Sequence, residues 1–545
     1  MSPSIVSRSA LGILAAGLFG ISAAQAQDSK AAPTTPAVTP AAAPAAAAVP
    51  EALYQQECAS CHGADRLGGQ GPALIPEALV RVRESVAREV IQKGRVATQM
   101  PGFSEKLAPE AIEQLVKYIY KPLPNVPKWT QADIAATREL AASPPRTDKP
   151  LHKSDPLNLF VVVETGDHHV TILDGDKFEP LHRFKSRFAL HGGPKFTPDG
   201  RYVFFASRDG WITKFDLHTF TVLGEVRAGL NTRNIAISKD GKHIAAANYL
   251  PHTLVLLSAE DLSVQKIIDA KDRQGQSSRV SAVYQNPVRD SFIVALKDVP
   301  ELWEIATDPK AEPVYGAFVH SRQPGLEEGI PESPGGLFAH RRITLGEPLD
   351  DFYFDPSYHN LLGASRDGAK AVVVNLDVRK AIARVDLPGM PHLGSGISWV
   401  YNGKRVMATP HLKEAKLSVI ELENWSVVKT LATGGPGFFM RSHEKTKYAW
   451  TDGMMGKTSK DTITLVDKQT LEIARTLTPV PGKVAAHVEF DRYGKHALVS
   501  IWENDGILIV YDVETLKEVK RLPMSKPSGK YNVYNKITFS EGTSH

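Results

Sequence analysis

The two cysteines of this chain lie in one pentapeptide with a histidine, Cys58-Ala59-Ser60-Cys61-His62. In a C-x-x-C-H motif the two thiols can add to the vinyl groups of a haem, and the imidazole can bind the haem iron. A dithiol redox pair needs no histidine, and a zinc site needs further Cys or His ligands at finger-like spacing. The motif therefore predicts a covalent c-type haem, attached through Cys58 and Cys61 and with His62 as an iron ligand.

A methionine downstream of this motif is the candidate for the sixth iron ligand. Met100 opens the segment Met-Pro-Gly-Phe after a short stretch of expected helix. A thioether opposite a histidine gives a low-spin iron suited to electron transfer. We also expect residues 71–74 to form a turn against the haem, and residues 108–120 to form a helix, because their apolar side chains recur at helical spacing. Residues 51–125 thus resemble a small, all-α class I cytochrome c.

The start of the chain predicts export. Residues 1–26 contain Arg8, an apolar run over residues 11–24 and an Ala-Gln-Ala cleavage site, the pattern of a secretory signal peptide. Covalent haem on an exported chain indicates the periplasm. No later stretch reaches about 18 consecutive apolar residues, so we expect no membrane span after cleavage. The net charge of +4 on 545 residues gives no reason to expect nucleic acid as a partner.

Two proline-rich stretches indicate domain boundaries. Residues 27–50 are mostly Ala, Pro and Thr and predict a flexible linker. Residues 126–156 are again rich in proline and predict a connecting segment laid over the surface of the next domain. Residues 157–545 remain for that domain.

A repeated pattern fills this last region. A polar turn, often with Asp-Gly, precedes a short apolar strand and two further strands, as in residues 198–217 and 239–257. Neighbouring copies lie roughly 40–50 residues apart, which is typical of a four-stranded propeller blade. Together with an incomplete copy at Phe160, eight copies predict an all-β, eight-bladed β-propeller. We expect the C-terminal segment to supply an outer strand that the first copy lacks.

Several stretches of the propeller resemble the cytochrome cd1 nitrite reductase superfamily. They are Phe188–Gly193, Met390–Gly396, Gly434–His443 and Pro527–Asn535. Members of this superfamily are periplasmic and join a cytochrome c domain to an eight-bladed propeller that holds haem d1 non-covalently. The resemblance implies haem d1 or dihydro-haem d1 in the propeller, with His191 as the proximal iron ligand and His392 as the distal one.

One departure separates the chain from the nitrite reductases. Those enzymes use two distal histidines to protonate nitrite, and one of them falls in a stretch that here reads Glu-Pro-Leu-Asp-Asp-Phe-Tyr-Phe (residues 347–354). A general acid contributes roughly 10²–10⁴-fold to a rate, so this loss argues against nitrite reduction. The Leu-Asp-Asp-Phe run, with the retained C-x-x-C-H motif, instead resembles the dihydro-haem d1 dehydrogenases. These enzymes of haem d1 biosynthesis oxidise a propionate of dihydro-haem d1 to an acrylate and pass electrons to haem c.

That reaction removes two electrons and two protons, so it needs an electron sink and a base. The resemblance implies the haem irons as the sink. His487 stands where the reductases have no histidine and is the candidate base, and Tyr531 is its candidate partner, orienting the propionate or passing on its proton. The substrate carries several carboxylates, so cationic side chains should line its pocket. The candidates are Arg208, Arg233, Arg279, Lys297 and Arg441.

Two other functions stay open. The chain could be a nitrite reductase of the same superfamily, or a haem d1 carrier or electron-transfer cytochrome without catalytic activity. A carrier would bind the tetrapyrrole unchanged and would not need His487. For the dehydrogenase, the expected partners are dihydro-haem d1 as substrate, a periplasmic electron acceptor, and a cytochrome cd1 nitrite reductase that receives haem d1.

Overall fold

The computed structural model describes residues 50–69, 71–80, 82–94, 100–125, 127–315, 332–364, 370–539 and 541–542. The predicted signal peptide and all but the last residue of the predicted linker lie outside this set. Residues 48–545 form one compact unit. Within the described ranges, no helix has the length and apolar character needed to cross a membrane.

Short helices build the N-terminal cytochrome c domain. They are α1 (Pro50–Glu57), α2 (Ala59–His62), α3 (Pro76–Leu79), α4 (Glu84–Lys93) and α5 (Pro109–Ile119). The helix predicted at residues 108–120 is therefore confirmed as α5. Its buried face packs with Leu53 and Tyr54 of α1. Arg88 of α4 and Glu113 of α5 form an ion pair (2.6 Å) that ties these two helices together.

The connecting segment lies on the propeller. It contains α6 (Gln131–Ala136) and β1 (Glu139–Leu140), and η1 (Pro156–Asn158) follows at its end. Thr130 and Asp133 form a capping box that starts α6, and Ile134 is buried in a propeller core cluster. β1 pairs with an outer propeller strand through Glu139 and Glu225. The segment thus adds a fifth strand to one blade.

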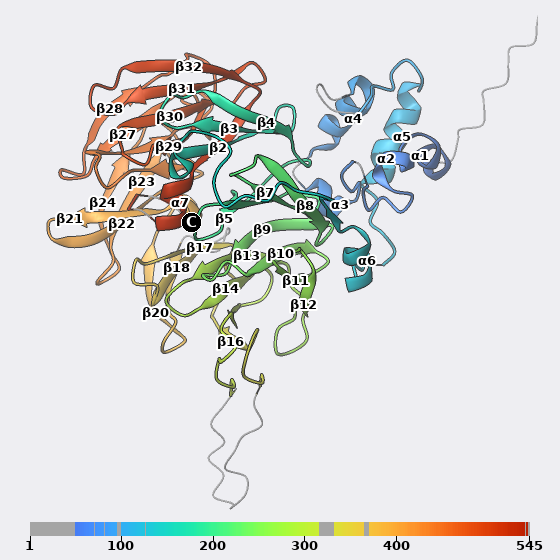
Figure 1. Cartoon of the computed structure of the whole chain (residues 1–545), viewed down its shortest axis with the longest axis horizontal. Helices are drawn as coiled ribbons and strands as arrows, with labels where there is room; N and C mark the ends of the chain where they lie inside the picture. The colour runs from blue at the N-terminus through green and yellow to red at the C-terminus, as the bar shows by residue number, and fades with distance from the viewer. Residues whose placement is uncertain are drawn as a thin grey trace, which may run out of the picture. The chain divides into compact units, whose positions relative to one another are not determined.

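The other described strands form eight antiparallel sheets, which confirms the eight-bladed β-propeller (Figure 1). We number the blades in chain order. Blade 1 consists of β33 (Pro527–Asn532), β2 (Leu159–Glu164), β3 (His169–Asp174) and β4 (Pro180–Lys185), and blade 2 of β5 (Lys195–Phe196), β6 (Tyr202–Ala206), β7 (Trp211–Asp216) and β8 (Thr221–Arg227). Blade 3 consists of β9 (Asn231–Ile237), β10 (His243–Leu250), β11 (Thr253–Ser258) and β12 (Val264–Asp269), and blade 4 of β13 (Val280–Asn286), β14 (Ser291–Leu296), β15 (Glu301–Ala306) and β16 (His340–Thr344).

Blades 5 to 8 have the same strand order, from the inner edge to the outer edge. Blade 5 consists of β17 (Asp351–Phe354), β18 (Asn360–Ala364), β19 (Lys370–Asn375) and β20 (Lys380–Asp386), and blade 6 of β21 (Ile397–Tyr401), β22 (Lys404–Pro410), β23 (Lys416–Glu421) and β24 (Ser426–Ala432). Blade 7 consists of β25 (Met440–Arg441), β26 (Tyr448–Asp452), β27 (Ile463–Asp467) and β28 (Ile473–Leu477), and blade 8 of β29 (Ala485–Phe490), β30 (His496–Ile501), β31 (Gly506–Asp512) and β32 (Glu518–Met524). Two short helical elements complete the domain, η2 (Leu393–Ser395) and α7 (Val533–Thr538).

The repeated polar turn joins the first and second strands of a blade. In blade 2, Asp199 accepts the backbone N–H of Arg201, and Gly200 takes a left-handed conformation (φ +74°). In blade 3, Asp240 accepts the N–H of Lys242 in the same way. An Asp side chain that bonds the backbone two residues later stabilises a tight turn, so the repeat seen in the sequence is the inner hairpin of these blades.

The C-terminal strand closes the ring at the inner edge, so the prediction of an outer strand is wrong. β33 pairs with β2, with Lys530 opposite Val162 and Tyr531 opposite Val161, while β4 takes the outer edge. All six residues of β2 are buried, so this strand needs a neighbour on each side, whereas β4 has the partly exposed pattern of an edge strand. The closure places Lys530 and Tyr531 on the innermost strand of blade 1.

Candidate haem sites and active site

The predicted c-type haem site lies on α2. Cys58 precedes this helix and Cys61 and His62 belong to it, and both thiols are free. His62 is 8% exposed, and its Nδ1 lies 2.8 Å from the carbonyl oxygen of Pro72. A Cβ atom on Gly71 would lie 2.6 Å from Cε1 of His62, so the turn predicted at residues 71–74 packs directly against this ring. The carbonyl fixes the imidazole and leaves Nε2 for iron, so these residues fit a c-type haem.

Met100, the predicted sixth ligand, is partly buried against the core of the cytochrome domain. The same core contains Tyr54, whose hydroxyl donates to the carbonyl of Gly63 (2.8 Å), next to His62. Met100 therefore belongs to the domain that carries the C-x-x-C-H motif. Its role as a ligand stays a prediction.

The loop after His62 is attached to the propeller. The Arg227 guanidinium at the end of β8 donates to the carbonyl oxygens of Leu67 (2.7 Å) and Asp209 (2.8 Å). A small apolar cluster joins this loop to blade 3 and consists of Ala73, Ile75, Leu230 and Leu250. The cytochrome c domain is thus bonded to blades 2 and 3 beside its predicted haem ligand.

The two predicted ligands of haem d1 iron share the arrangement of His62. Nδ1 of His191 lies 2.8 Å from the carbonyl oxygen of Arg233, and Nδ1 of His392 lies 2.6 Å from that of Phe438. The His392 ring also packs on Phe438, with the ring centroids 4.0 Å apart. A backbone carbonyl at Nδ1 selects the tautomer whose Nε2 can bind a metal. Both side chains therefore fit the predicted role.

Two of the five predicted cationic side chains flank His191. Arg208 lies 2.7 Å from Nε2 of His191, and a terminal nitrogen of Arg233 lies 3.3 Å from Nδ1. Arg208 therefore has to release Nε2 before this nitrogen can bind iron.

Two further candidates lie around the Tyr249 ring. The Arg279 guanidinium lies 5.5 Å from the ring centroid, and the Lys297 ammonium 5.9 Å. Arg279 pairs with Asp298 (2.5 Å), and Lys297 pairs with Asp350. Because carboxylates of the protein already neutralise these two charges, the pair is poorly suited to bind substrate carboxylates.

Arg441, the fifth candidate, lies on β25 of blade 7. It is 3% exposed, and its Nε lies 3.9 Å from Glu489 and has no hydrogen-bond partner among the described residues. Burial lowers the pKa of this guanidinium, and its charge in turn lowers the pKa of Tyr531 against the effect of burial. Arg441 thus accompanies the predicted catalytic pair.

His487 and Tyr531 lie in contact, on β29 and β33. Their ring centroids are 5.2 Å apart with an interplanar angle of 66°. His487 is completely buried, and neither of its ring nitrogens has a hydrogen-bond partner in the described part of the chain. Buried polar atoms are nearly always paired, so an imidazole with two free nitrogens indicates a group that awaits a ligand.

The environment of this pair sets its protonation. Burial, followed by the charges of Lys530 and Arg441, holds the pKa of His487 well below 6.5. Burial raises the pKa of Tyr531 to about 12. At neutral pH, His487 is therefore an unprotonated base and Tyr531 a hydrogen-bond donor.

The pair connects the loops that carry the two predicted iron ligands. A Cβ atom on Gly193, in the loop of His191, would lie 3.2 Å from the Tyr531 ring. The Phe439 ring lies 4.7 Å from His487 and 6.3 Å from His392, centroid to centroid. One network of contacts thus joins residues of blades 1, 7 and 8 to the loops before blades 2 and 6, and it contains two histidines suited to iron, a neutral base and a phenol.

Five buried charged side chains near these residues were not predicted as site residues from the sequence. They are Lys195, Asp351, Asp452, Lys530 and Lys536. Burial lowers the pKa of each lysine, to about 8 for Lys195, and raises that of Asp452 to about 6. Lys530 lies inside a stretch that carries the family resemblance, and Asp351 lies in the Leu-Asp-Asp-Phe run, so both had a sequence signal. Neither Lys195 nor Asp452 lies in a motif that would have marked it in the sequence.

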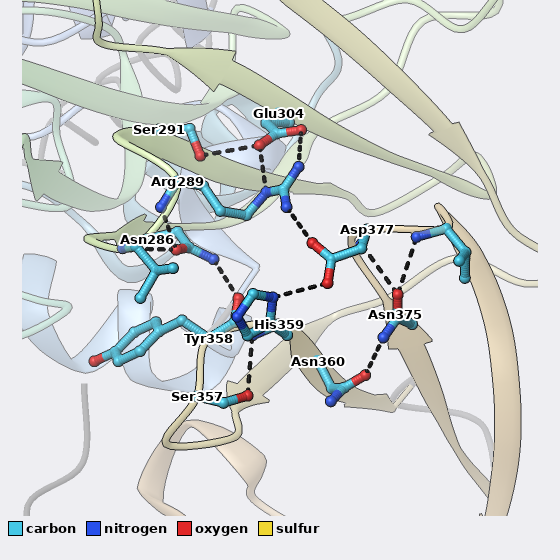
Figure 2. A network of polar contacts seen from close by, with 12 residues as sticks. Asn286, Arg289, Ser291, Glu304, Ser357, Tyr358, His359, Asn360, Asn375 and Asp377 are labelled. Atoms are coloured by element: carbon cyan, nitrogen blue, oxygen red, sulfur yellow. Dashed lines mark hydrogen bonds and ion pairs between the residues drawn. The ribbon is translucent and has the colours of Figure 1, made fainter.

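A separate cavity of about 350 Å³ lies beside blades 4 and 5, away from these residues. Arg289 bridges Glu304 (2.7 Å) and Asp377 (2.6 Å), and His359 also contacts Asp377 (2.8 Å) (Figure 2). The carboxylates neutralise the guanidinium. The Arg289–Asp377 contact joins blade 4 to blade 5, whereas Arg289–Glu304 lies within blade 4 and His359–Asp377 within blade 5. This network holds two blades together and contains none of the predicted site residues.

Comparisons with known proteins agree with this arrangement. The family described as "Cytochrome D1 heme domain" matches residues 154–316 and 334–536, and the family "Cytochrome C oxidase, cbb3-type, subunit III" matches residues 45–119. The chain is 55% identical over 499 residues to the dihydro-haem d1 dehydrogenase of Pseudomonas aeruginosa, covering 91% of this chain and 95% of that protein. It is 25% identical to the nitrite reductase of Stutzerimonas stutzeri, over 89% of this chain and 92% of that protein.

A solved structure extends the match to three dimensions. Dihydro-haem d1 dehydrogenase NirN in complex with DHE superimposes with a TM-score of 0.83 and 54% identity, over 90% of this chain and 100% of that one. The two haem domains predicted from the sequence, one for haem c and one for a d1-type haem, are therefore both present. With both domains matched at this identity, the chain belongs to the cytochrome d1 haem-domain family and, within it, to the dihydro-haem d1 dehydrogenases.

Proposed function

We propose that this protein oxidises a propionate side chain of dihydro-haem d1 to an acrylate, as a step of haem d1 biosynthesis. The observation that carries the assignment is His487, a buried imidazole with two free nitrogens, held against Tyr531 beside two histidines whose Nδ1 atoms are fixed. These residues would place a base next to a bound iron macrocycle. Its relative from P. aeruginosa is named as a dihydro-haem d1 dehydrogenase.

The chemistry converts a CH₂–CH₂ unit into CH=CH and releases two protons and two electrons. His487 is neutral near pH 7 and accepts a proton from the side chain. Tyr531 keeps its proton, so it can donate a hydrogen bond to the propionate carboxylate and orient it, and Arg441 adds positive charge beside this carboxylate. Haem c, held by Cys58, Cys61 and His62, would accept one electron, and the iron of the tetrapyrrole, held by His191 and His392, would accept the other, so the two electrons would leave in one-electron steps.

In this proposal, His191 and His392 would both be ligands of the substrate's iron. A second protein ligand would compete with nitrite for the iron, and the second distal histidine of the reductases is missing from residues 347–354. Oxidation of the macrocycle's own side chain is therefore favoured over nitrite reduction at the iron.

The location and partners of the protein follow from its sequence and product. The predicted signal peptide indicates the periplasm. The acceptor of the electrons from haem c is then a periplasmic redox protein, and a cytochrome cd1 nitrite reductase is the consumer of the haem d1 product. Dihydro-haem d1 is the substrate.

The test is anaerobic incubation of the purified holoprotein with dihydro-haem d1, followed by mass spectrometry of the extracted tetrapyrrole and by the visible spectrum of haem c. We expect loss of two hydrogen atoms together with reduction of haem c. A bound but unchanged tetrapyrrole would indicate a carrier. Turnover of nitrite by the haem d1-loaded protein would indicate a reductase.

A further inference from the structure

The backbone of His487 has a conformation that other residues must stabilise. Its φ is +48°, in the left-handed region that side-chain-bearing residues rarely adopt. The pairing of β29 with β30 shifts register between Ala486 and Val488, so His487 is the extra residue of a β-bulge. A bulge redirects one side chain out of the regular alternation of a strand. The bulge therefore determines where the imidazole points.

Two buried side chains from other blades hold this bulge. The N–H of His487 donates to the carboxylate of Asp452 on β26 (3.1 Å). The carbonyl oxygen of His487 accepts a hydrogen bond from Lys530 on β33, whose ammonium also donates to Ser500 (2.8 Å). Asp452 is 1% exposed and Lys530 is fully buried. The peptide groups on both sides of the His487 Cα atom are thus fixed.

Asp452 has a second set of contacts that leads to the distal iron ligand. Its carboxylate accepts the backbone N–H groups of Phe438 (2.8 Å) and Phe439 (3.3 Å). The carbonyl oxygen of Phe438 in turn accepts the Nδ1 hydrogen of His392 (2.6 Å). One carboxylate therefore supports both the bulge of His487 and the turn that orients His392. Lys530 contacts the bulge, and no hydrogen bond joins it to that turn in the described residues.

We propose that Asp452 and Lys530 are positioning residues, with Asp452 aligning both His487 and His392, and Lys530 aligning His487 alone. This inference rests on the proposed function, because the two histidines are aligned toward the propionate and the iron of dihydro-haem d1. An amide at position 452 has the same size as the carboxylate but turns an NH₂ donor toward backbone N–H donors. A methionine at position 530 fills the space of lysine and removes the donor from the His487 carbonyl.

The experiment compares Asp452→Asn and Lys530→Met with two matched controls in blade 2. The controls are Asp216→Asn, which alters a buried carboxylate bonded to Arg201 (3.0 Å), and Lys214→Met, which removes a buried ammonium bonded to the Glu260 carbonyl (2.8 Å). Each holoprotein is loaded anaerobically with dihydro-haem d1. The two readouts are the single-turnover oxidation rate per loaded molecule and the spin state of the tetrapyrrole iron.

We expect both test variants to lose roughly 10²-fold in rate, the usual cost of misplacing a reacting group by about 1 Å. Asp452→Asn should also lose the low-spin spectrum that His392 gives, whereas Lys530→Met should keep it. The controls should match the wild-type protein in both readouts. A purely structural role would lower the loaded fraction and leave the rate per loaded molecule unchanged.

Wild-type rates in both test variants would overturn the proposal. A change of spin state in Lys530→Met equal to that in Asp452→Asn would overturn the division of roles. If Lys530→Met does not fold, Ser500→Ala replaces it, because this change removes the second hydrogen-bond partner of the Lys530 ammonium. Ser500→Ala should also lower the single-turnover oxidation rate. An unchanged rate would count against the proposal. Failure of the wild-type protein to oxidise dihydro-haem d1 would overturn the proposed function itself, a result distinct from all of these.

Discussion

The histidines predicted to bind iron are held by their rings, whereas the histidine predicted to move a proton is held by its backbone. In His62, His191 and His392, Nδ1 lies 2.6–2.8 Å from a carbonyl oxygen of a neighbouring loop. His487 has no such contact within the described ranges, and its peptide groups are bonded instead. A metal ligand needs one fixed tautomer, but a base needs a nitrogen that is free to take a proton and later to release it. The contrast separates these three histidines from His487.

The largest effect should follow from His487→Gln, which keeps a polar side chain of similar size but removes the base. We expect the single-turnover oxidation rate to fall roughly 10²–10⁴-fold. Binding of dihydro-haem d1, followed by absorbance titration, should change little, because the two iron ligands remain. Stopped-flow spectroscopy of the loaded protein measures the rate.

The matched control is His243→Gln, in another buried histidine of the propeller, on blade 3. A ring nitrogen of His243 contacts the side-chain oxygen of Gln265 (2.8 Å), and in the described part of the chain neither ring nitrogen is left buried without a partner. Equal loss of rate in both variants would mean that His487 has no special role.

The next largest effect should come from the distal iron ligand. In His392→Ala, the iron of bound dihydro-haem d1 should change from low spin to high spin, visible by absorption and electron paramagnetic resonance. The oxidation rate should fall by roughly 10–100-fold, less than for His487→Gln, because the base remains in place. An unchanged spectrum would remove His392 from the ligand set and with it one half of the contrast.

A smaller effect is expected at the haem c end. The Cβ atom of Gly71→Ala would lie 2.6 Å from the His62 ring, so the ring or the loop has to move. We expect a destabilisation of the cytochrome c domain by about 1–3 kcal/mol, measured by denaturant unfolding followed in the haem c absorption. Gly346→Ala serves as the control, since its nearest new contact would be an ordinary 3.5 Å. Equal stability of the two variants would contradict the tight packing of His62.

The smallest effect concerns pH. Burial, with the cations Lys530, Arg441 and Lys536 around it, holds the pKa of His487 well below 6.5. A base with a lowered pKa is already unprotonated at pH 6.5, so the oxidation rate should stay flat as the pH rises from there, and should fall only in more acidic buffer. If the oxidation rate still rises between about pH 6.5 and about pH 7.5, the group that abstracts the proton has an ordinary histidine pKa.

The sequence predicts the fold well because the relevant signals are local. Cys58–His62 lies on one helix, and the Asp-Gly turns mark the inner hairpins of blades 2 and 3. The position of the closing strand was predicted incorrectly, because β33 pairs with β2 from the opposite end of the domain and no local pattern distinguishes an inner from an outer edge there.

The site is less predictable from sequence than the fold. His487 and Tyr531 were assigned by family resemblance and chemical suitability, and their contact depends on the pairing of β33 with β2 and its packing beside β29. Asp452 has no motif at all, because it acts through backbone groups of residues 438, 439 and 487 that only the packing of blades 7 and 8 brings together. Positioning residues of this kind are visible only in three dimensions.

Proton abstraction from the propionate by His487 is tested most directly with isotopically labelled substrate. Dihydro-haem d1 carrying hydrogen or deuterium on both methylene carbons of its propionates is loaded into the wild-type protein and into His487→Gln, and single-turnover oxidation is followed. We predict slower oxidation of the deuterated substrate by the wild-type protein and a large loss of rate in the variant. Equal rates for both isotopes, together with an undiminished rate in His487→Gln, would contradict proton abstraction by His487.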